Sequence, residues 1–250
     1  ESFADFTKKK ARRLLVPYFG YNLFLFLFFF VKNDLLAGQV SAQSFFPLLG
    51  ILYSRNCLFP ADAPGNVYFM QILNAPTWFL TCMFLAYLIF WLLMRAAKGN
   101  MKKALYLNFG LLLASVLLHY LCPVLLPWSL DCALYSVSFL MFGSSLARRE
   151  LVEKLYRKPG ILVLLAAAFI GLSCLNGSVN MSVADYGRSM ILYLVIGGLG
   201  SFLVMEASLF LEKHAGVFAK ACGFLGRHTM PVLCLHLFVY SIIETILNIL

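Results

Sequence analysis

Long runs of apolar residues, separated by short polar segments, dominate the chain. Seven runs have about the length that an α-helix needs to cross a bilayer core, roughly 20 residues. The run Phe45–Tyr53 is shorter and contains Pro47 and Gly50, so we expect an interfacial or re-entrant piece there. The pattern predicts an all-α protein, a polytopic transmembrane helix bundle. The seven predicted spans are Leu14–Val31, Pro76–Met94, Leu105–Cys122, Leu130–Leu146, Ile161–Leu175, Met190–Leu211 and Thr229–Leu250.

Prolines stand close to the predicted starts of three spans. They are Pro17, Pro76 and Pro231. A proline in the first helical turn costs no hydrogen bond, because the N–H that it lacks would have no partner there. We therefore expect all three prolines to lie in first turns.

Basic residues are distributed unevenly over the segments that connect the spans. With the N-terminus of the chain in the cytoplasm, all but three of the 20 Lys and Arg residues fall on the cytoplasmic side, the exceptions being Lys32, Arg55 and Arg188. Because cytoplasmic loops are enriched in Lys and Arg, this predicts a multi-pass protein of the cytoplasmic (inner) membrane. The net charge of +9 reflects topology, and we expect no nucleic-acid partner because no soluble face mixes basic and aromatic residues.

The composition excludes a disordered chain and most soluble enzymes, since 62% of the residues are hydrophobic and only 12% are charged. The seven Cys and four His lack the spacing of metal ligands, so we expect no metal. The chain, residues 1–250, is predicted to be a single membrane-embedded domain. Residues 33–75 form its one long connection, which we expect to be a partly ordered outer loop.

Ionisable residues within predicted spans are candidates for function, because a charge in hydrocarbon is costly. His236, Tyr240 and Glu244 follow one another at every fourth position of the last span, which places them on one helical face. Such a stripe could relay protons or line a polar cavity; alternatively, His236 and Glu244 each hydrogen-bond a neighbouring helix. Glu206, near the inner end of the sixth span, is expected to pair with Arg227 or another basic residue.

A basic cluster, Lys8-Lys-Lys-Ala-Arg-Arg13, precedes the first span. One interpretation is that it fixes the orientation of the span and contacts anionic lipids. The other is a phosphate-binding patch, because guanidinium and ammonium groups bind phosphate oxygens.

Four segments resemble motifs of the acyltransferase 3 family of multi-pass membrane enzymes, and most closely its fucose 4-O-acetylase-like subgroup. The RxxR element of the family is similar to Lys10-Ala-Arg-Arg13-Leu-Leu-Val-Pro-Tyr18, and its Pro-x-Trp-Phe-Leu span start is similar to Asn74-Ala-Pro-Thr-Trp78-Phe-Leu80. Its short outer turn and the helix that follows resemble Leu126-Pro-Trp-Ser-Leu-Asp131 and Phe139-Leu-Met-Phe-Gly143. Its late helix that ends in Leu-His resembles Gly226-Arg-His-Thr-Met-Pro-Val-Leu-Cys-Leu-His236.

The resemblance implies that an acyl group, usually acetyl, passes from cytoplasmic acetyl-CoA to a hydroxyl of a carbohydrate acceptor, in a cell-surface polysaccharide or its precursor. Lys10 and Arg13 would bind the CoA phosphates. Trp78 and His236 would be walls or proton partners of the transfer chamber. Trp128 and Asp131 would lie near the acceptor-side mouth, although a tryptophan at a membrane interface is also a common anchor.

The sequence departs from the family pattern in two ways. The first two spans of the family, including the histidine thought to be catalytic, have no counterpart here, so we expect these residues alone to be inactive. In addition, Lys10 replaces the first Arg of RxxR, which exchanges a bidentate phosphate contact for a point charge.

Two classes of function other than an enzyme remain open. A transporter or flippase of a sugar-linked substrate would need inverted repeats and broken helices, and no repeat is evident. A structural or sensory membrane domain would have His236 and Glu244 satisfied by neighbouring helices. The enzyme hypothesis instead predicts a polar channel that joins the Arg13 region to an outer cleft lined by His236.

Overall fold

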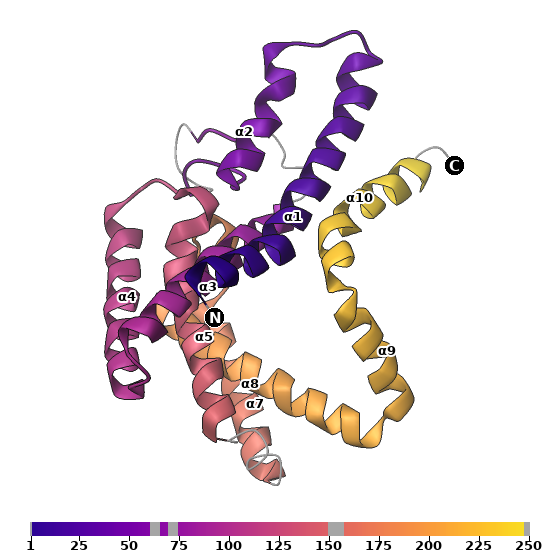
Figure 1. Cartoon of the computed structure of the whole chain (residues 1–250). Helices are drawn as coiled ribbons and strands as arrows, with labels where there is room; N and C mark the ends of the chain where they lie inside the picture. Colours follow the sequence, from indigo (N-terminus) through magenta and orange to yellow (C-terminus); the bar gives the residue numbers. More distant parts are fainter. Residues whose placement is uncertain (1, 61–65, 70–74, 150–157, 248–250) are drawn as a thin grey trace.

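The computed structural model describes residues 2–60, 66–69, 75–149 and 158–247, and these are almost entirely helical (Figure 1). Among the described residues, six helices are long and apolar enough to span a membrane, and a bent pair would make seven. The prediction of an all-α bundle is confirmed. The longer helices are α1 (Phe3–Phe29), α2 (Phe46–Tyr53), α3 (Trp78–Ala96), α4 (Met101–Leu121), α5 (Leu130–Arg149), α7 (Pro159–Asn176), α8 (Met190–His214), α9 (Gly216–Arg227) and α10 (Thr229–Leu247).

Helix α1 is longer than the predicted span. Ser2 caps its N-terminus by accepting a hydrogen bond from the backbone N–H of Asp5, and the basic cluster then continues the helix because Lys and Arg are good helix formers. Pro17 therefore lies inside α1, and the prediction that it occupies a first turn was wrong. The prediction holds for Pro231, in the first turn of α10, while Pro76 lies in the short 3-10 turn Ala75–Thr77 before α3.

The other end of the chain also differs from the expectation. The segment before the last span, predicted to be an inner loop, forms helix α9. The axes of α9 and α10 meet at an angle of 78° at His228, so the pair is either one broken span or a re-entrant element. In Figure 1, α8 leads away from the central helices, and α9 and α10 return toward α1.

The core lies where α3 and α5 pack together, with α4 against α5 and α1 against α3. Helix α7 pairs with α8. Two glycines of α8 allow neighbouring helices to approach closely, because a Cβ at Gly197 would lie 2.6 Å from the ring of Phe139, and one at Gly200 would lie 2.9 Å from the ring of Phe169. Helix α10 is attached mainly to α1, through Met230, Leu233 and Cys234.

Candidate functional site

A buried arginine, Arg55, joins three segments at the end of the bundle where α2 stops. Its guanidinium donates to the backbone carbonyl of Leu126 at 3.3 Å and to that of Ser182 at 2.7 Å. It also forms an ion pair with the carboxylate of Asp131, and its Nη2 atom lies 3.6 Å from the sulfur of Cys132. The side chain of Arg55 is 0% exposed. We call this group of five residues the Arg55 junction.

The electrostatics of the Arg55 junction favour a fixed positive charge. Burial acts against the charged guanidinium, but Cys132 and Asp131 more than offset it, so the pKa of Arg55 is raised and the side chain stays protonated. The hydroxyl of Tyr186 donates to the sulfur of Cys132 at 3.6 Å, and burial raises the pKa of Tyr186. Because its pKa is raised, Tyr186 stays neutral and acts as a hydrogen-bond donor. The ring of His119 contacts that of Tyr186, with 5.4 Å between centroids.

Three predicted site residues lie in or beside the Arg55 junction: Trp78, expected at the transfer chamber, and Trp128 and Asp131, expected near the acceptor-side mouth. Trp128 donates its indole N–H to the carbonyl of Leu52 at 2.8 Å, which ties the start of α5 to the end of α2. Trp78 packs against the buried cluster that includes Cys132. Asp131 belongs to the Arg55 junction itself. The structure thus places Trp78, Trp128 and Asp131 in one neighbourhood, and their roles in a site stay predictions.

A second set of polar contacts fastens α1 to this region. The side-chain amide of Asn22 donates to the hydroxyl of Thr77 at 3.1 Å, and the hydroxyl of Tyr18 donates to the carbonyl of Ile51 at 2.7 Å. The hydroxyls of Ser54 and Thr81 are hydrogen-bonded at 2.7 Å. Each of these bonds joins residues far apart in the sequence, so the polar positions within the spans of α1 and α3 hold the bundle together.

The basic cluster lies on the first turns of α1. The Nζ atom of Lys10 lies 3.4 Å from the centre of the Tyr87 ring in α3, a cation–π contact that fixes the position of the ammonium group. Arg13 is exposed. Since α1 rises 1.5 Å per residue, Arg13 and Asp34 are about 30 Å apart along the axis, which is the thickness of a bilayer core.

The predicted stripe on α10 is exposed and does not join the Arg55 junction. Tyr240 is 67% exposed, and His236 and Glu244 are exposed as well. The Nδ1 atom of His236 lies 3.1 Å from the carbonyls of Val232 and Leu233 in its own helix. Neither Arg13 nor His236 lines any of five cavities found among the described residues, so these cavities do not form the channel expected between them.

The predicted ion pair of Glu206 with Arg227 or another basic residue is not found in the described part of the chain. Glu206 is only 4% exposed, and neither carboxylate oxygen has a hydrogen-bond partner there. The side chain lines an otherwise largely apolar groove of about 510 Å³ between α7 and α8, together with Val163, Phe210 and His214. The pairing failed because Arg227 lies on α9, beyond the end of α8.

We expect Glu206→Met to raise the thermal unfolding midpoint of the detergent-solubilised protein by a few degrees, about 1 kcal/mol or more, because it removes a desolvated carboxylate that has no compensating bond. The matched control is Glu212→Met on the exposed face of the same helix, which should leave the midpoint unchanged. A lower midpoint for Glu206→Met would mean that the buried carboxylate is stabilised by its surroundings despite having no hydrogen-bond partner.

Sequence reasoning missed Arg55 and Tyr186. The available signal for Arg55 was its position as one of only three basic residues on the side opposite the basic cluster, where Asp131 was also predicted to lie. No local pattern links the two, because they are 76 positions apart. Tyr186 gave no signal, since its partner Cys132 belongs to another segment.

These features define a polytopic helical membrane protein with a basic end on α1 and a buried polar junction among α2, α5 and the segment before α8. A model of the acyltransferase domain family Acyl_transf_3 matches residues 1–250. The chain belongs to this family, which confirms the predicted family, and it is therefore a membrane acyltransferase by family. No curated protein and no solved structure matches the chain.

Proposed function

We propose that the protein transfers an acetyl group from acetyl-CoA, on the cytoplasmic side of the inner membrane, to a hydroxyl of a sugar in a cell-surface polysaccharide or its precursor. The observation that carries the proposal is the family match over the whole chain. The segregation of basic residues supports the orientation, with the start of α1 in the cytoplasm. The motif likeness to fucose 4-O-acetylases supports acetyl transfer to a sugar.

The start of α1 carries basic side chains suited to bind the phosphates of acetyl-CoA, the acetyl donor. The exposed guanidinium of Arg13 offers paired N–H donors to a phosphate, and Lys10, held in place by Tyr87, adds a point charge one turn earlier. A nucleotide diphosphate carries the negative charge that such a pair attracts. Lys10 and Arg13 are therefore the proposed acetyl-CoA contacts, with the thioester directed into the membrane.

The residues in and beside the Arg55 junction include side chains suited to bind the sugar acceptor. Asp131 forms an ion pair with Arg55, and its carboxylate oxygens can accept a hydrogen bond from a sugar hydroxyl. Trp78 and Trp128 supply aromatic surfaces against which a sugar ring can pack. We assign these three residues to acceptor binding.

Transfer requires removal of one proton. The acceptor oxygen attacks the thioester carbon, the new C–O bond forms, the C–S bond breaks, and CoA leaves as a thiolate that takes up a proton. His236 is suited to assist, because the carbonyls beside Nδ1 favour a proton on that nitrogen and leave the Nε2 lone pair free. Tyr240 and Glu244 would extend the proton path along α10.

The experiment measures transfer of radiolabelled acetyl from acetyl-CoA to endogenous glycan in membranes that contain the intact protein. We expect transfer with the wild type, and His236→Ala should lower the rate by roughly 10²-fold, the usual contribution of acid–base catalysis, without changing the affinity for acetyl-CoA. The control is His228→Ala, since His228 is also exposed and also has Nδ1 beside a carbonyl of its own helix, at 2.9 Å.

Two results would contradict the proposal. Absence of labelled glycan from wild-type membranes would reject acetyl transfer to a sugar. Equal rates for His236→Ala and the wild type would remove His236 from the proton path.

A further inference from the structure

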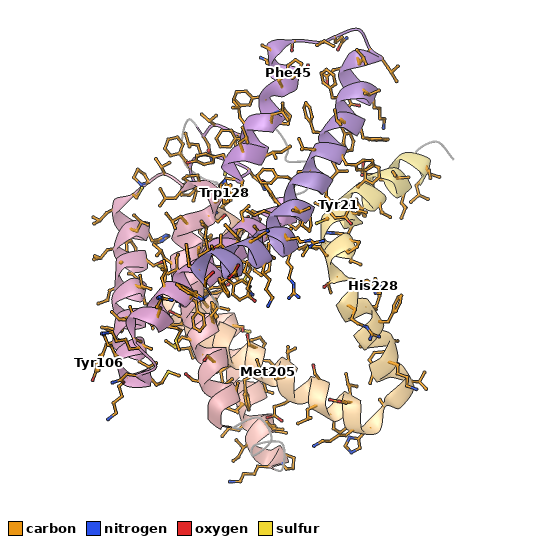
Figure 2. The ribbon with its side chains drawn as sticks, in the orientation of Figure 1. Tyr21, Phe45, Tyr106, Trp128, Met205 and His228 are labelled. Atoms are coloured by element: carbon orange, nitrogen blue, oxygen red, sulfur yellow. The ribbon has the colours of Figure 1, made fainter. Side chains whose placement is uncertain are left out.

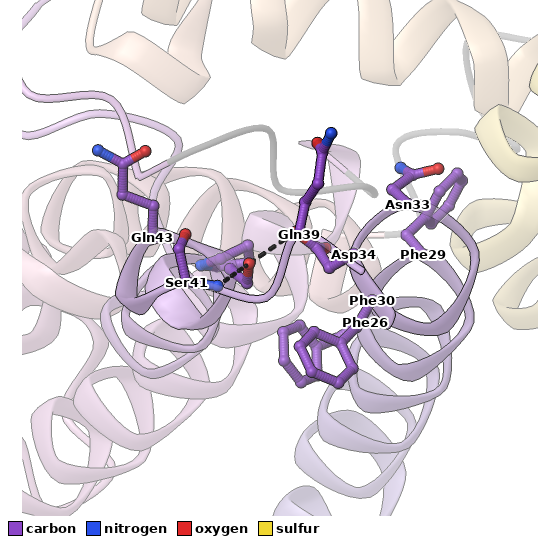
Figure 3. Close-up of a pocket in the computed structure, with 10 residues that line it drawn as sticks. Phe26, Phe29, Phe30, Asn33, Asp34, Gln39, Ser41 and Gln43 are labelled. Atoms are coloured by element: carbon purple, nitrogen blue, oxygen red, sulfur yellow. Dashed lines mark hydrogen bonds between the residues drawn. The ribbon is translucent and has the colours of Figure 1, made fainter. Parts of the chain in front are cut away.

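A polar pocket lies at the far end of α1 from the basic cluster, between this end and the approach to α2 (Figure 3). Its volume is about 320 Å³, within the range of small-molecule sites. The lining combines phenylalanine rings, including Phe26 and Phe30, with the side chains of Asn33, Asp34 and Gln39. None of the residues proposed to bind acetyl-CoA or the sugar acceptor lines this pocket.

The loop that forms the pocket is held by its own hydrogen bonds. Helix α1 widens into the π-helical turn Phe30–Leu35, and Gly38 then adopts a φ of +66°, a conformation that favours glycine. Asp34 accepts a bond from the backbone N–H of Gln39 at 2.9 Å through its carbonyl, and one from the hydroxyl of Ser44 at 2.6 Å through its carboxylate. The two sides of the pocket are thus fastened together before a ligand arrives.

The amide side chains in the pocket are available for binding. Figure 3 shows Asn33, Gln39 and Gln43 extending to the same side of the loop. Each is exposed, and within the described part of the chain the side chains of Gln39 and Gln43 make no hydrogen bond. An amide offers both donors and acceptors, which matches the dual character of a sugar hydroxyl.

The charges of the lining narrow the class of ligand. The only ionisable side chain in it is Asp34, and no Lys, Arg or His is present among the described residues that line it. Phosphate or sulfate groups would therefore find no positive partner and one negative neighbour. The stacked rings of Phe26 and Phe30, with centroids 5.7 Å apart, supply an apolar surface beside the amides. Amides, a carboxylate and aromatic rings together fit an uncharged polyhydroxylated molecule.

We propose that the pocket between the end of α1 and the approach to α2 binds an uncharged saccharide, as a subsite that holds part of the acceptor away from the transfer point. The inference rests on the proposed function. With the start of α1 in the cytoplasm, as proposed, the other end of α1 lies on the opposite side of the membrane, where the acceptor glycan lies. The subsite adds Asn33, Gln39 and Gln43 as specificity-determining residues that the acetyl-transfer proposal does not use.

The test probes the detergent-solubilised, fluorescently labelled protein with an array of neutral, sulfated and phosphorylated oligosaccharides. We expect retention on neutral members, and the double variant Gln39→Ala/Gln43→Ala should weaken binding at least tenfold with an unchanged thermal midpoint, because these side chains make no internal bond. Asn33→Ala should have a smaller effect in the same direction. The matched control is Lys32→Ala, an exposed residue of the same turn that does not line the pocket.

The outcomes separate this inference from the proposed function. Retention of charged glycans only, retention of none, or equal binding by wild type and double variant overturns the saccharide subsite. If the wild type transfers acetyl groups and the double variant has the same KM for the acceptor, acetyl transfer stands and the subsite is rejected. If neutral glycans bind through Gln39 and Gln43 but no acetyl is transferred, saccharide binding by the pocket stands, while the proposed reaction and the role of the pocket as an acceptor subsite are rejected.

Discussion

Replacing Arg55 with methionine is expected to destabilise the protein more than any other single substitution considered for this fold. The change leaves the carboxylate of Asp131 without its counter-charge and the carbonyls of Leu126 and Ser182 without their donors. Removing one partner of a buried ion pair costs about 3–5 kcal/mol, because the other charge stays desolvated. Thermal unfolding of the detergent-solubilised protein should show a lower midpoint, or the variant should fail to accumulate in membranes.

A second variant makes the prediction specific to the ion pair. Adding Asp131→Leu to Arg55→Met removes the stranded carboxylate, so the double variant should be more stable than Arg55→Met alone. The control is Arg188→Met, an exposed arginine that precedes α8, which should unfold like the wild type. If the midpoint of Arg55→Met equals that of the wild type, Arg55 does not hold the three segments together.

Replacing Arg13 with alanine is expected to weaken acetyl-CoA binding by roughly 10- to 100-fold, the loss that accompanies removal of a charge-assisted hydrogen bond of about 1.5–3 kcal/mol. The affinity is measured by calorimetry on the intact protein. Lys10→Ala should have a smaller effect, because an ammonium group supplies a point charge without the paired geometry of a guanidinium. Raising the salt concentration should weaken wild-type binding more than Arg13→Ala binding.

Two controls distinguish a phosphate site from general surface charge. Acetyl-pantetheine lacks the nucleotide phosphates, so Arg13→Ala should bind it as the wild type does. Arg12 is also exposed and lies one position away on a different face of α1, so Arg12→Ala should retain acetyl-CoA affinity. Equal losses for Arg12→Ala and Arg13→Ala would contradict a specific site at Arg13.

The spans could be predicted because the bilayer imposes a simple requirement on length and polarity. Helices α3, α4, α5, α7 and α8 coincide closely with predicted spans. The short apolar run predicted at 45–53 is helix α2. Errors occurred at the two ends, where the basic cluster continues α1 and where α9 forms instead of a loop. A hydropathy pattern does not show where polar segments form helices, because the basic start of α1 and helix α9 do not need burial in lipid to form.

The candidate site was predictable only in part. The resemblance named Trp78, Trp128 and Asp131, which the structure places near one another. The spacing along the last span named His236, Tyr240 and Glu244, which the structure leaves exposed on a helix attached mainly to α1. The lack of a hydrogen bond to Glu206 within the described residues was not predictable either, because it depends on where the other helices place their polar groups.

The order of apolar residues along the chain was enough to establish a helical membrane protein, because each span satisfies its own backbone hydrogen bonds and needs no distant partner. The Arg55 junction, the bond between Asn22 and Thr77 and the pocket at the end of α1 arise instead from packing. Their partners are distant in sequence or meet only where the chain turns back on itself, and no local pattern records which polar groups a folded bundle brings within hydrogen-bonding distance.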